Sequence, residues 1–312
     1  MPTAVVVIPT KNEEQTISDV ISDVRGAFDT LHYDRVEIVV TDDSTDRTRG
    51  IAKELGARVV NGGGEGLGTA MYRGLKASLK LNPDVIVSID GDGQTNARAE
   101  IASFLAPIEQ GDADLVLGSR FQKQALVEYR YRPVNRFGTA VLTWILRRMT
   151  SLKLTDSHGG IRAMAPEVVR ELQILGTHTY VQETIVDASE KGFRIVELPS
   201  VWKKREFGKS RVVGSIPRYI AYTLPVLLLR SGQHIRALYT CGGALVLGAF
   251  LVFVTVLVQE GLTLALGHRT PAFILIALMI MAGLQMVFFG FSFQLLKQMK
   301  RSLDRIEHNE HP

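Results

Sequence analysis

Residues 85–94, VIVSIDGDGQ, form an apolar run that ends abruptly in two aspartates. Residues 85–89 are β-branched apart from one serine, which is typical of a buried strand. Because side chains two apart on an extended chain point the same way, Asp90 and Asp92 can converge on one cation. A hard divalent cation held by one or two carboxylates completes its shell with water and substrate phosphates. An Asp-Gly turn that merely ends a strand gives the same pattern, since both residues favour turns.

Strands and helices alternate on either side of this stretch. Strands are expected at 4–8, 36–40, 57–60 and 115–118, and helices at 17–28, 46–55, 69–80 and 96–108. This alternation predicts an α/β fold whose mostly parallel sheet is covered by helices on both faces. Ligands bind such sheets at the carboxyl ends of the strands. The loops that begin at Pro9, Thr41 and Asp90 are therefore expected at one edge.

Beyond residue 121 the pattern loosens. Residues 135–150 place apolar side chains near one helical face with Arg136, Arg147 and Arg148 beside them, which suits either a membrane interface or packing against the sheet. Further helices are expected at 166–175 and 180–191, a strand at 195–201, a basic loop at 203–211 and an interfacial helix at 216–229.

Two long segments near the C-terminus carry no charged residue. They cover residues 237–258 and 271–296, and each is long enough to cross a hydrocarbon core of ~30 Å. They predict a transmembrane hairpin. Basic residues flank the two segments, whereas the connecting loop carries only Arg269, so the catalytic part and both termini are expected to be cytoplasmic. The flanking residues are Arg230, Arg236, Lys297, Lys300, Arg301 and Arg305.

Composition excludes several classes of protein. The single cysteine, Cys241, excludes a disulfide framework and a cysteine-based metal site. The formal net charge of +4 among 312 residues comes partly from the juxtamembrane residues, which suits anionic lipids. No basic-aromatic module for nucleic acid is present. The first residues contain a five-residue apolar run without a basic leader, which predicts a strand and not a signal peptide.

Seven blocks, in order, resemble the GT-A glycosyltransferases of family 2, and within it the dolichol- or polyprenyl-phosphate mannose and hexose synthases. The similarity covers about residues 4–211. The blocks are 5–13 (VVVIPTKNE), 42–46 (DDSTD), 66–74 (GLGTAMYRG), 90–94 (DGDGQ), 118–121 (GSRF), 156–162 (DSHGGIR) and 205–210 (REFGKS). Lys11 stands where the family often has an aromatic residue, and Asp43 replaces a turn glycine.

The resemblance implies a GT-A fold, Rossmann-like, and inverting transfer of a hexose from a nucleotide diphosphate sugar to dolichyl or polyprenyl phosphate. Mannose from GDP-mannose is the favoured donor group, because residues 66–74 are closest to the mannose synthases. The implied domains are a cytoplasmic catalytic domain (1–212), an interfacial segment (213–235), two transmembrane helices (236–297) and a cytoplasmic tail (298–312). The implied partners are the sugar nucleotide, the lipid phosphate and the bilayer, with no nucleic acid and with self-association left open.

The resemblance also implies roles for individual residues. Mg²⁺ or Mn²⁺ would be held by Asp90, Asp92 and Gln94. The acceptor phosphate would meet Arg120, Arg136 and Ser210. The nucleotide sugar would lie against Pro9, Lys11, Glu13, Asp42, Asp90, Gly91, Asp92, Arg205 and Lys209, with Asp90, Asp92 and Arg205 acting in catalysis.

Three alternatives remain at this stage. The donor could instead be UDP-glucose or another UDP-sugar. A processive polysaccharide synthase usually carries a Gln-x-x-Arg-Trp block, and neither Trp144 nor Trp202 lies in one. A membrane protein that binds a nucleotide sugar without activity would not need both Asp90 and Asp92.

Overall fold

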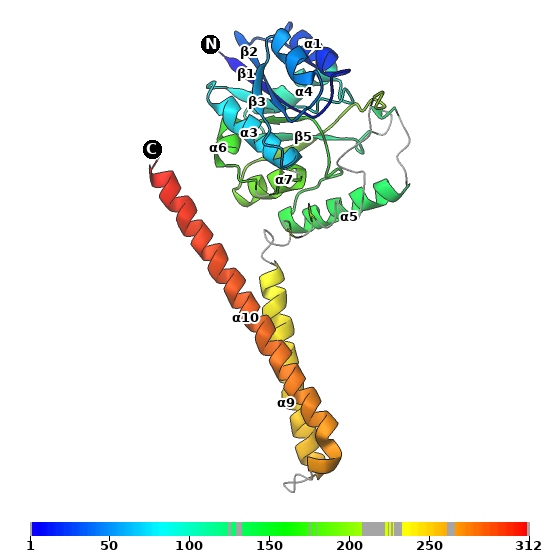
Figure 1. Cartoon of the computed structure of the whole chain (residues 1–312), viewed down its shortest axis with the longest axis vertical. Helices are drawn as coiled ribbons and strands as arrows, with labels where there is room; N and C mark the ends of the chain where they lie inside the picture. Colours follow the sequence, from blue (N-terminus) through cyan, green and yellow to red (C-terminus); the bar gives the residue numbers. More distant parts are fainter. Residues whose placement is uncertain are drawn as a thin grey trace. The chain divides into compact units, whose positions relative to one another are not determined.

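The computed structural model describes residues 2–123, 126–128, 133–174, 176–178, 180–207, 222–223, 225, 227, 233–260 and 266–310. The chain divides into two compact units, Met1–Leu227 and Leu228–Pro312, and each unit is described by itself. Figure 1 labels many of the elements in each unit.

The first unit is built on a seven-stranded sheet with the strand order β3-β2-β1-β4-β6-β5-β7. Its strands are β1 (Thr3–Thr10), β2 (Arg35–Asp42), β3 (Arg58–Asn61), β4 (Val85–Ser88), β5 (Leu115–Ser119), β6 (Arg162–Met164) and β7 (Ile195–Pro199). Only β6 is antiparallel to its neighbours, β4 and β5. The prediction of a mostly parallel α/β sheet is therefore confirmed.

Central strand β1 fixes the site because both of its neighbours run parallel to it. Val7 pairs with Ser88 of β4, and Thr10 pairs with Asp42 of β2. The carboxyl ends of β1, β2 and β4 therefore meet at one edge, as the sequence predicts. Every residue of β1 is buried, so alternate side chains supply two cores, one on each face of the sheet.

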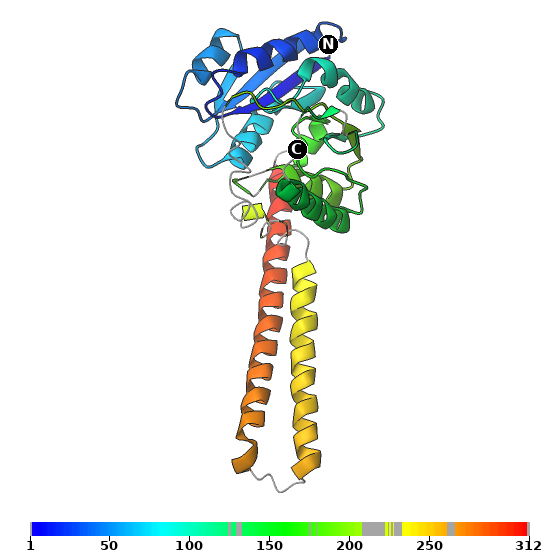
Figure 2. The same cartoon turned by 90° about the vertical axis from the view of Figure 1, so that its right-hand side faces the viewer.

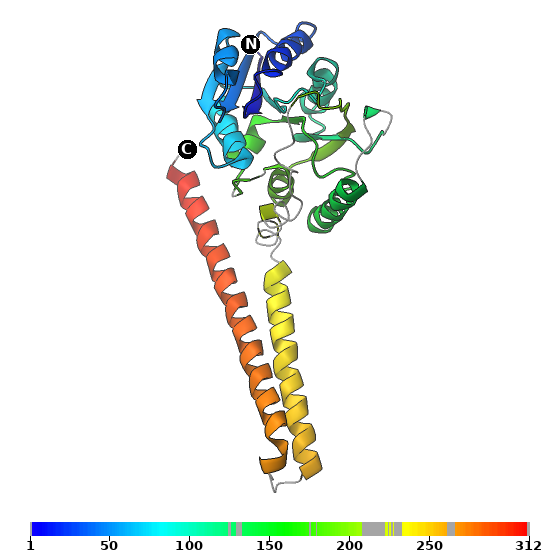
Figure 3. The same ribbon diagram turned by 45° about the vertical axis from the view of Figure 1, so that its right-hand side comes forward.

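Helices cover both faces. The face that receives Val6 and Ile8 packs against α1 (Ile17–Phe28), α2 (Thr48–Glu54) and α4 (Ala97–Glu109). The face that receives Val5 and Val7 packs against α3 (Leu67–Leu79), α5 (Pro133–Thr150), α6 (Pro166–Glu171) and α7 (Val181–Glu190). Figure 3 gives an oblique view of the sheet and of the helices on its two faces.

Most element boundaries match the sequence-based expectations within a few residues, with one clear difference. Helix α6 ends at Glu171, short of the expected residue 175, because the backbone at Leu172 is extended. Leu172 is buried in the core beneath α6. Tertiary packing therefore ends the helix earlier than the apolar pattern predicts.

The second unit consists of α9 (Gln233–Glu260) and α10 (Leu266–Glu310), which lie side by side (Figure 2). Gly242 and Gly283 face each other: a Cβ at Gly242 would lie 2.7 Å from the carbonyl oxygen of Gly283. Two segments, Ile235–Gln259 and Thr270–Leu296, are long and apolar enough to cross a membrane. They match the two predicted spans. Most of the interfacial helix predicted at 216–229 lies outside the described residues.

Candidate active site

The predicted metal-binding turn follows β4 at the carboxyl edge of the sheet. Gly91 is required there, because a Cβ at this position would lie 2.8 Å from Thr10 Cγ2 and 3.1 Å from the Pro9 carbonyl oxygen. The backbone of Asp90–Asp92 can therefore lie directly against the end of β1. Thr16 Oγ1 donates a 2.8 Å hydrogen bond to the Gly91 carbonyl oxygen and anchors the turn.

Arg205 reaches this turn from the segment after β7. Its Nη2 donates a hydrogen bond to Asp92 Oδ2, and its Nε lies 3.5 Å from Gln94 Oε1. Its Nη1 lies 3.9 Å from Glu13 Oε1. Four sequence-predicted site residues from three separate segments therefore meet in one cluster: Glu13, Asp92, Gln94 and Arg205.

Asp90 lies in a setting that disfavours a negative charge. Burial raises the pKa of its carboxyl group, and the neighbouring charge of Asp92 raises it further, against the opposing effect of Arg162, Arg205 and Arg120. Gly160 lies close beside it, since a Cβ there would come within 2.4 Å of Asp90 Oδ2. A bound cation would offset the unfavourable charge of this carboxylate.

The residues fit a hard divalent cation. Asp90, Asp92 and the Gln94 amide offer only oxygen donors on one short turn, which is the ligand chemistry of Mg²⁺ and Mn²⁺. Among the residues that the structure describes, no three His, Cys, Asp or Glu side chains form a metal-binding group by themselves. An ion held here would take the rest of its shell from water and from substrate phosphates.

The loops after β1 and β2 are joined by Asn12. Its Oδ1 accepts a 2.8 Å hydrogen bond from Thr45 N, and its backbone N donates to Ser44 Oγ at 2.7 Å. Asn12 has a φ of 52°, a left-handed conformation that asparagine tolerates better than most residues. These two hydrogen bonds fix the position of the neighbouring Glu13 beside the Asp90–Asp92 turn.

The predicted nucleotide residues differ in their surroundings. Pro9 is buried at the end of β1, and Lys11 is exposed. Asp42 is fully buried, and its carboxylate accepts hydrogen bonds from Thr10 Oγ1 at 2.9 Å and Arg49 Nε at 3.0 Å. Asp42 therefore links the end of β2 to the end of β1 through one oxygen and to α2 through the other.

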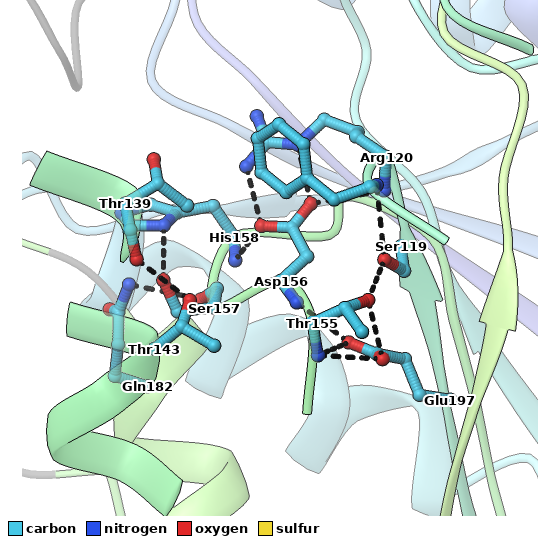
Figure 4. Close-up of polar contacts among 11 residues, drawn as sticks. Ser119, Arg120, Thr139, Thr143, Thr155, Asp156, Ser157, His158, Gln182 and Glu197 are labelled. Atoms are coloured by element: carbon cyan, nitrogen blue, oxygen red, sulfur yellow. Dashed lines mark hydrogen bonds and ion pairs between the residues drawn. The ribbon is translucent and has the colours of Figure 1, made fainter. Parts of the chain in front are cut away.

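Arg120 forms a buried ion pair at the end of β5 (Figure 4). Its Nε and Nη2 donate to the two oxygens of Asp156 at 2.6 and 2.7 Å, and its backbone N donates to Oδ2 at 3.1 Å. The guanidinium also lies 4.9 Å from the Trp202 ring centroid. This two-point pairing fixes the orientation of Arg120.

Glu197 of β7 supports the turn that carries Asp156 (Figure 4). It accepts hydrogen bonds of 2.8 Å from Thr155 Oγ1 and from Asp156 N. On the other side of Asp156, burial and the charge of Arg120 lower the pKa of His158 to about 3. His158 is therefore neutral near pH 7, and its Nδ1 lies 2.7 Å from Ser157 Oγ.

The structure thus separates the predicted residues into groups. Glu13, Asp92, Gln94 and Arg205 come together at the carboxyl edge beside Asp90. Arg120 is paired with Asp156, and Arg136 is exposed on α5. Lys209 and Ser210 lie outside the described residues. Sequence reasoning missed the contacts of Glu197 and Trp202 because their partners are remote in the sequence. It missed Arg49 because this residue lies outside the recognised blocks, although its partner Asp42 is seven residues away.

Glu100 of α4 was also missed, and it anchors the segment that carries Arg205. Its carboxylate accepts a hydrogen bond from Val201 N, and burial raises the pKa of Glu100 to about 7. Since the folded pKa exceeds the unfolded value, the protonated group stabilises the fold most below pH ~4.5, and this stability is lost as pH rises to about 7.

We therefore expect Glu100→Gln to remove this pH dependence. Relative to the unsubstituted protein, its free energy of unfolding should rise between pH 5 and pH 8. Thermal unfolding at both pH values measures the change, with exposed Glu54→Gln as the control. Equal shifts for the two variants would contradict the anchoring role.

Comparison with known proteins supports one family. Residues 5–173 match the family described as "Glycosyl transferase family 2". The low-salt glycan biosynthesis hexosyltransferase Agl6 of Haloferax volcanii is 32% identical over 206 residues, which cover 66% of this chain and 49% of that protein. The chain therefore matches about half the length of that relative.

The names of two further relatives refer to phosphorylated dolichyl or polyprenol lipids. A dolichyl-phosphate hexose transferase of Haloferax volcanii is 30% identical, over 64% of this chain and 82% of its own length. A polyprenol monophosphomannose synthase of Mycolicibacterium smegmatis is 29% identical, over 67% and 81%.

A solved structure has the same fold. Glucosyl-3-phosphoglycerate synthase from Mycobacterium tuberculosis, in complex with Mn²⁺, UDP-glucose and phosphoglyceric acid, superposes with a TM-score of 0.57. It is 25% identical, and the match covers 74% of this chain and 80% of that one. The strand order of the sheet and the clustered site agree with the match over residues 5–173. This chain therefore belongs to glycosyltransferase family 2 and has a GT-A fold.

Proposed function

We propose that this enzyme transfers a hexose from a nucleoside diphosphate sugar to a polyprenyl or dolichyl phosphate at a membrane surface. The observation that carries the proposal is the convergence of Glu13, Asp92 and Arg205 at the carboxyl edge of the sheet. The two apolar helices place this site in a chain suited to a lipid acceptor. The names of the lipid-phosphate relatives point to the same acceptor chemistry.

Asp90, Asp92 and Gln94 are the proposed ligands of Mg²⁺ or Mn²⁺. A divalent ion bound there would neutralise the negative charge that develops on the leaving diphosphate. Arg205 carries a fixed positive charge beside the same turn and is the proposed contact to the phosphates of the donor. Glu13, which follows Asn12 in the chain, is a second acidic partner of Arg205 at 3.9 Å.

The acceptor needs little activation. The second pKa of a phosphate monoester is ~6, so the attacking oxygen is largely ionised at neutral pH. A strong protein base is therefore not required, and rate depends on holding the phosphate in line with the anomeric carbon. We propose inversion at that carbon, as the family resemblance implies.

A donor panel tests the reaction. The purified full chain is incubated with each of several nucleotide sugars, Mg²⁺ or Mn²⁺ and a short polyprenyl phosphate, and products are identified by mass spectrometry. A mono-hexosyl lipid phosphate supports the proposal. A polymer would indicate a processive enzyme, and no nucleotide release with lipid phosphate would indicate a binding protein.

GDP-mannose is the first donor to test, because residues 66–74 resemble the mannose synthases. UDP-glucose is the second, because the related synthase was solved with that nucleotide sugar. We expect isothermal titration with Mg²⁺ to give tighter binding of GDP than of UDP. Much tighter binding of UDP would indicate that the donor is a UDP-sugar and not GDP-mannose.

Arg136 is the proposed direct contact to the acceptor phosphate, with Arg120 as a second one. Because Asp156 already holds Nε and Nη2 of Arg120, we expect the larger effect on the acceptor from Arg136. A guanidinium offers two parallel donors to phosphate, which lysine does not. Arg136→Lys should therefore raise the apparent KM for lipid phosphate and leave donor binding unchanged.

Steady-state kinetics with varied lipid phosphate, and titration with the donor nucleotide, measure the two effects separately. Arg148→Lys on the same helix is the matched control. An Arg136→Ala protein with unaltered lipid kinetics would remove Arg136 from the acceptor site.

We also propose that α9 and α10 span the membrane and that the catalytic unit and both termini are cytoplasmic. The distribution of basic residues around the two apolar segments supports this orientation. Protease protection of sealed vesicles that contain the full chain tests it.

A further inference from the structure

Helix α5 is apolar on two opposite faces. One face packs into the catalytic unit through Thr139, Leu142, Thr143 and Leu146, all of which are buried. The other face is exposed and carries large apolar side chains at helical spacing, which we call the α5 stripe. Its members and their exposed fractions are Val134 (65%), Phe137 (72%), Val141 (40%) and Trp144 (58%).

The exposed apolar residues of the α5 stripe are regularly spaced along the helix and are not scattered over its surface. Its residues recur at intervals of three and four along the helix, so they share one face that points away from the packed face. Single exposed apolar residues are normal on a protein surface, but a contiguous patch of this kind marks an interaction site. The stripe therefore needs an apolar partner.

The charges near the stripe favour one kind of partner. Pro133–Thr150 contains three arginines and no acidic residue. The guanidinium of Arg148 lies 5.6 Å from the Trp144 ring centroid, and Arg136 is exposed. Apolar and aromatic side chains beside arginines suit the boundary between acyl chains and anionic headgroups.

The first apolar segment follows the catalytic core closely in the sequence. Leu227 is buried in the same core as Leu142 and Leu146 of α5. The first apolar segment begins at Ile235, eight residues later, and even a fully extended chain covers roughly 30 Å over that distance. The chain therefore tethers this core closely to the first apolar segment.

We propose that the α5 stripe docks into the interface of a bilayer that contains anionic phospholipids, with Phe137 and Trp144 below the headgroups. The docking does not require sugar transfer, and it rests only on the proposed membrane anchoring. It holds the catalytic unit at the membrane surface, where the phosphate of a polyprenyl lipid is presented.

The two tryptophans of the chain provide the test. Trp144 is exposed on the stripe, whereas Trp202 is buried at 5% exposure beside Arg120. The full chain is placed in nanodiscs of phosphatidylcholine and phosphatidylglycerol, with and without brominated acyl chains. A helix in the interface lies ~5–10 Å into the headgroup region, within range of bromine quenching, so we expect a loss of about half of the Trp144 emission.

Two variants assign the signal. Trp144→Phe leaves only Trp202 and should abolish the quenching. Phe137→Asp should reduce the quenching of Trp144, whereas Ala140→Ser, an exposed position outside the stripe, should not. Replacing phosphatidylglycerol by neutral lipid should weaken quenching in the unsubstituted protein, because the arginines lose their counter-charges.

Several outcomes would overturn the proposal. Unquenched Trp144 in a chain that is incorporated into nanodiscs would show that the stripe faces water or protein. Cross-linking of two chains through residue 137, with no quenching, would assign the stripe to a second copy. Failure of the full chain to enter nanodiscs would overturn both the anchoring and the docking.

Discussion

Replacing Asp92 by asparagine should lower turnover by more than ~100-fold while the protein folds normally, which is the loss expected when a main charge stabiliser is removed. The carboxylate contacts Arg205 through Oδ2 and accepts a 3.1 Å hydrogen bond from Gln94 N through Oδ1. Asparagine keeps the size and the acceptor oxygen but removes the charge. It therefore tests the charge of Asp92, which both the proposed metal site and the ion pair with Arg205 use.

The measurement pairs kinetics with binding. Single-turnover transfer reports the chemical step, and Mn²⁺ titration in the presence of nucleotide reports metal binding, which should also weaken. Asp34→Asn is the control, because Asp34 is exposed just before β2, at the opposite end of that strand from Asp42. Full activity of Asp92→Asn, or of the unsubstituted protein in excess chelator, would contradict the metal role.

The edge of the sheet that carries Asp92 was predictable from sequence. Strands β1, β2 and β4 are recognisable as local apolar runs. Because helices connect them, the strands are parallel and their carboxyl ends meet at one edge of the sheet. The turn at Asp90–Asp92 was predictable too, because Gly91 and the two aspartates are adjacent in sequence. Most strand and helix boundaries followed for the same reason: local periodicity determines them.

The partners of the site residues were not predictable in this way. Arg205 meets Asp92 across 113 residues, and Glu100 meets Val201 across 101. Periodicity within a strand or helix contains no information about such pairs. The same limit applies to α5: its sequence suited both sheet packing and a membrane interface, and the structure shows that one face is packed and the other is exposed.

The environment of Arg120 was not predictable either, because local sequence patterns do not reveal contacts between remote residues. The family resemblance implied an acceptor-phosphate contact for Arg120, and Asp156 appeared only within the 156–162 block. In the structure the pair is buried, with side-chain exposures of 7% and 0%. Burial alone would raise the pKa of Asp156, but the charge and hydrogen bonds of Arg120 outweigh it, so the pKa is lowered.

Asp156→Asn should therefore destabilise the catalytic unit by ~3–5 kcal/mol, because it leaves the buried charge of Arg120 without its partner. Asp114→Asn is the matched control: its ion pair with Arg194 is also 2.6 Å long but exposed, and exposed pairs contribute ~0–1 kcal/mol. Chemical denaturation of both variants in a Trp144→Phe background, followed by the fluorescence of buried Trp202, measures the difference.

The pH dependence separates a charge effect from a packing effect. Since the folded pKa of Asp156 lies below its unfolded value of ~3.9, the ion pair contributes its full stability above that pH and loses it as pH falls through the folded pKa. The difference between Asp156→Asn and the unsubstituted protein should accordingly be constant from pH 8 to pH 5 and shrink below pH 4. A difference that stayed the same at pH 3.5 would mean that the turn at residues 155–158 is held by its backbone contacts to Glu197, with the charge of Asp156 contributing little.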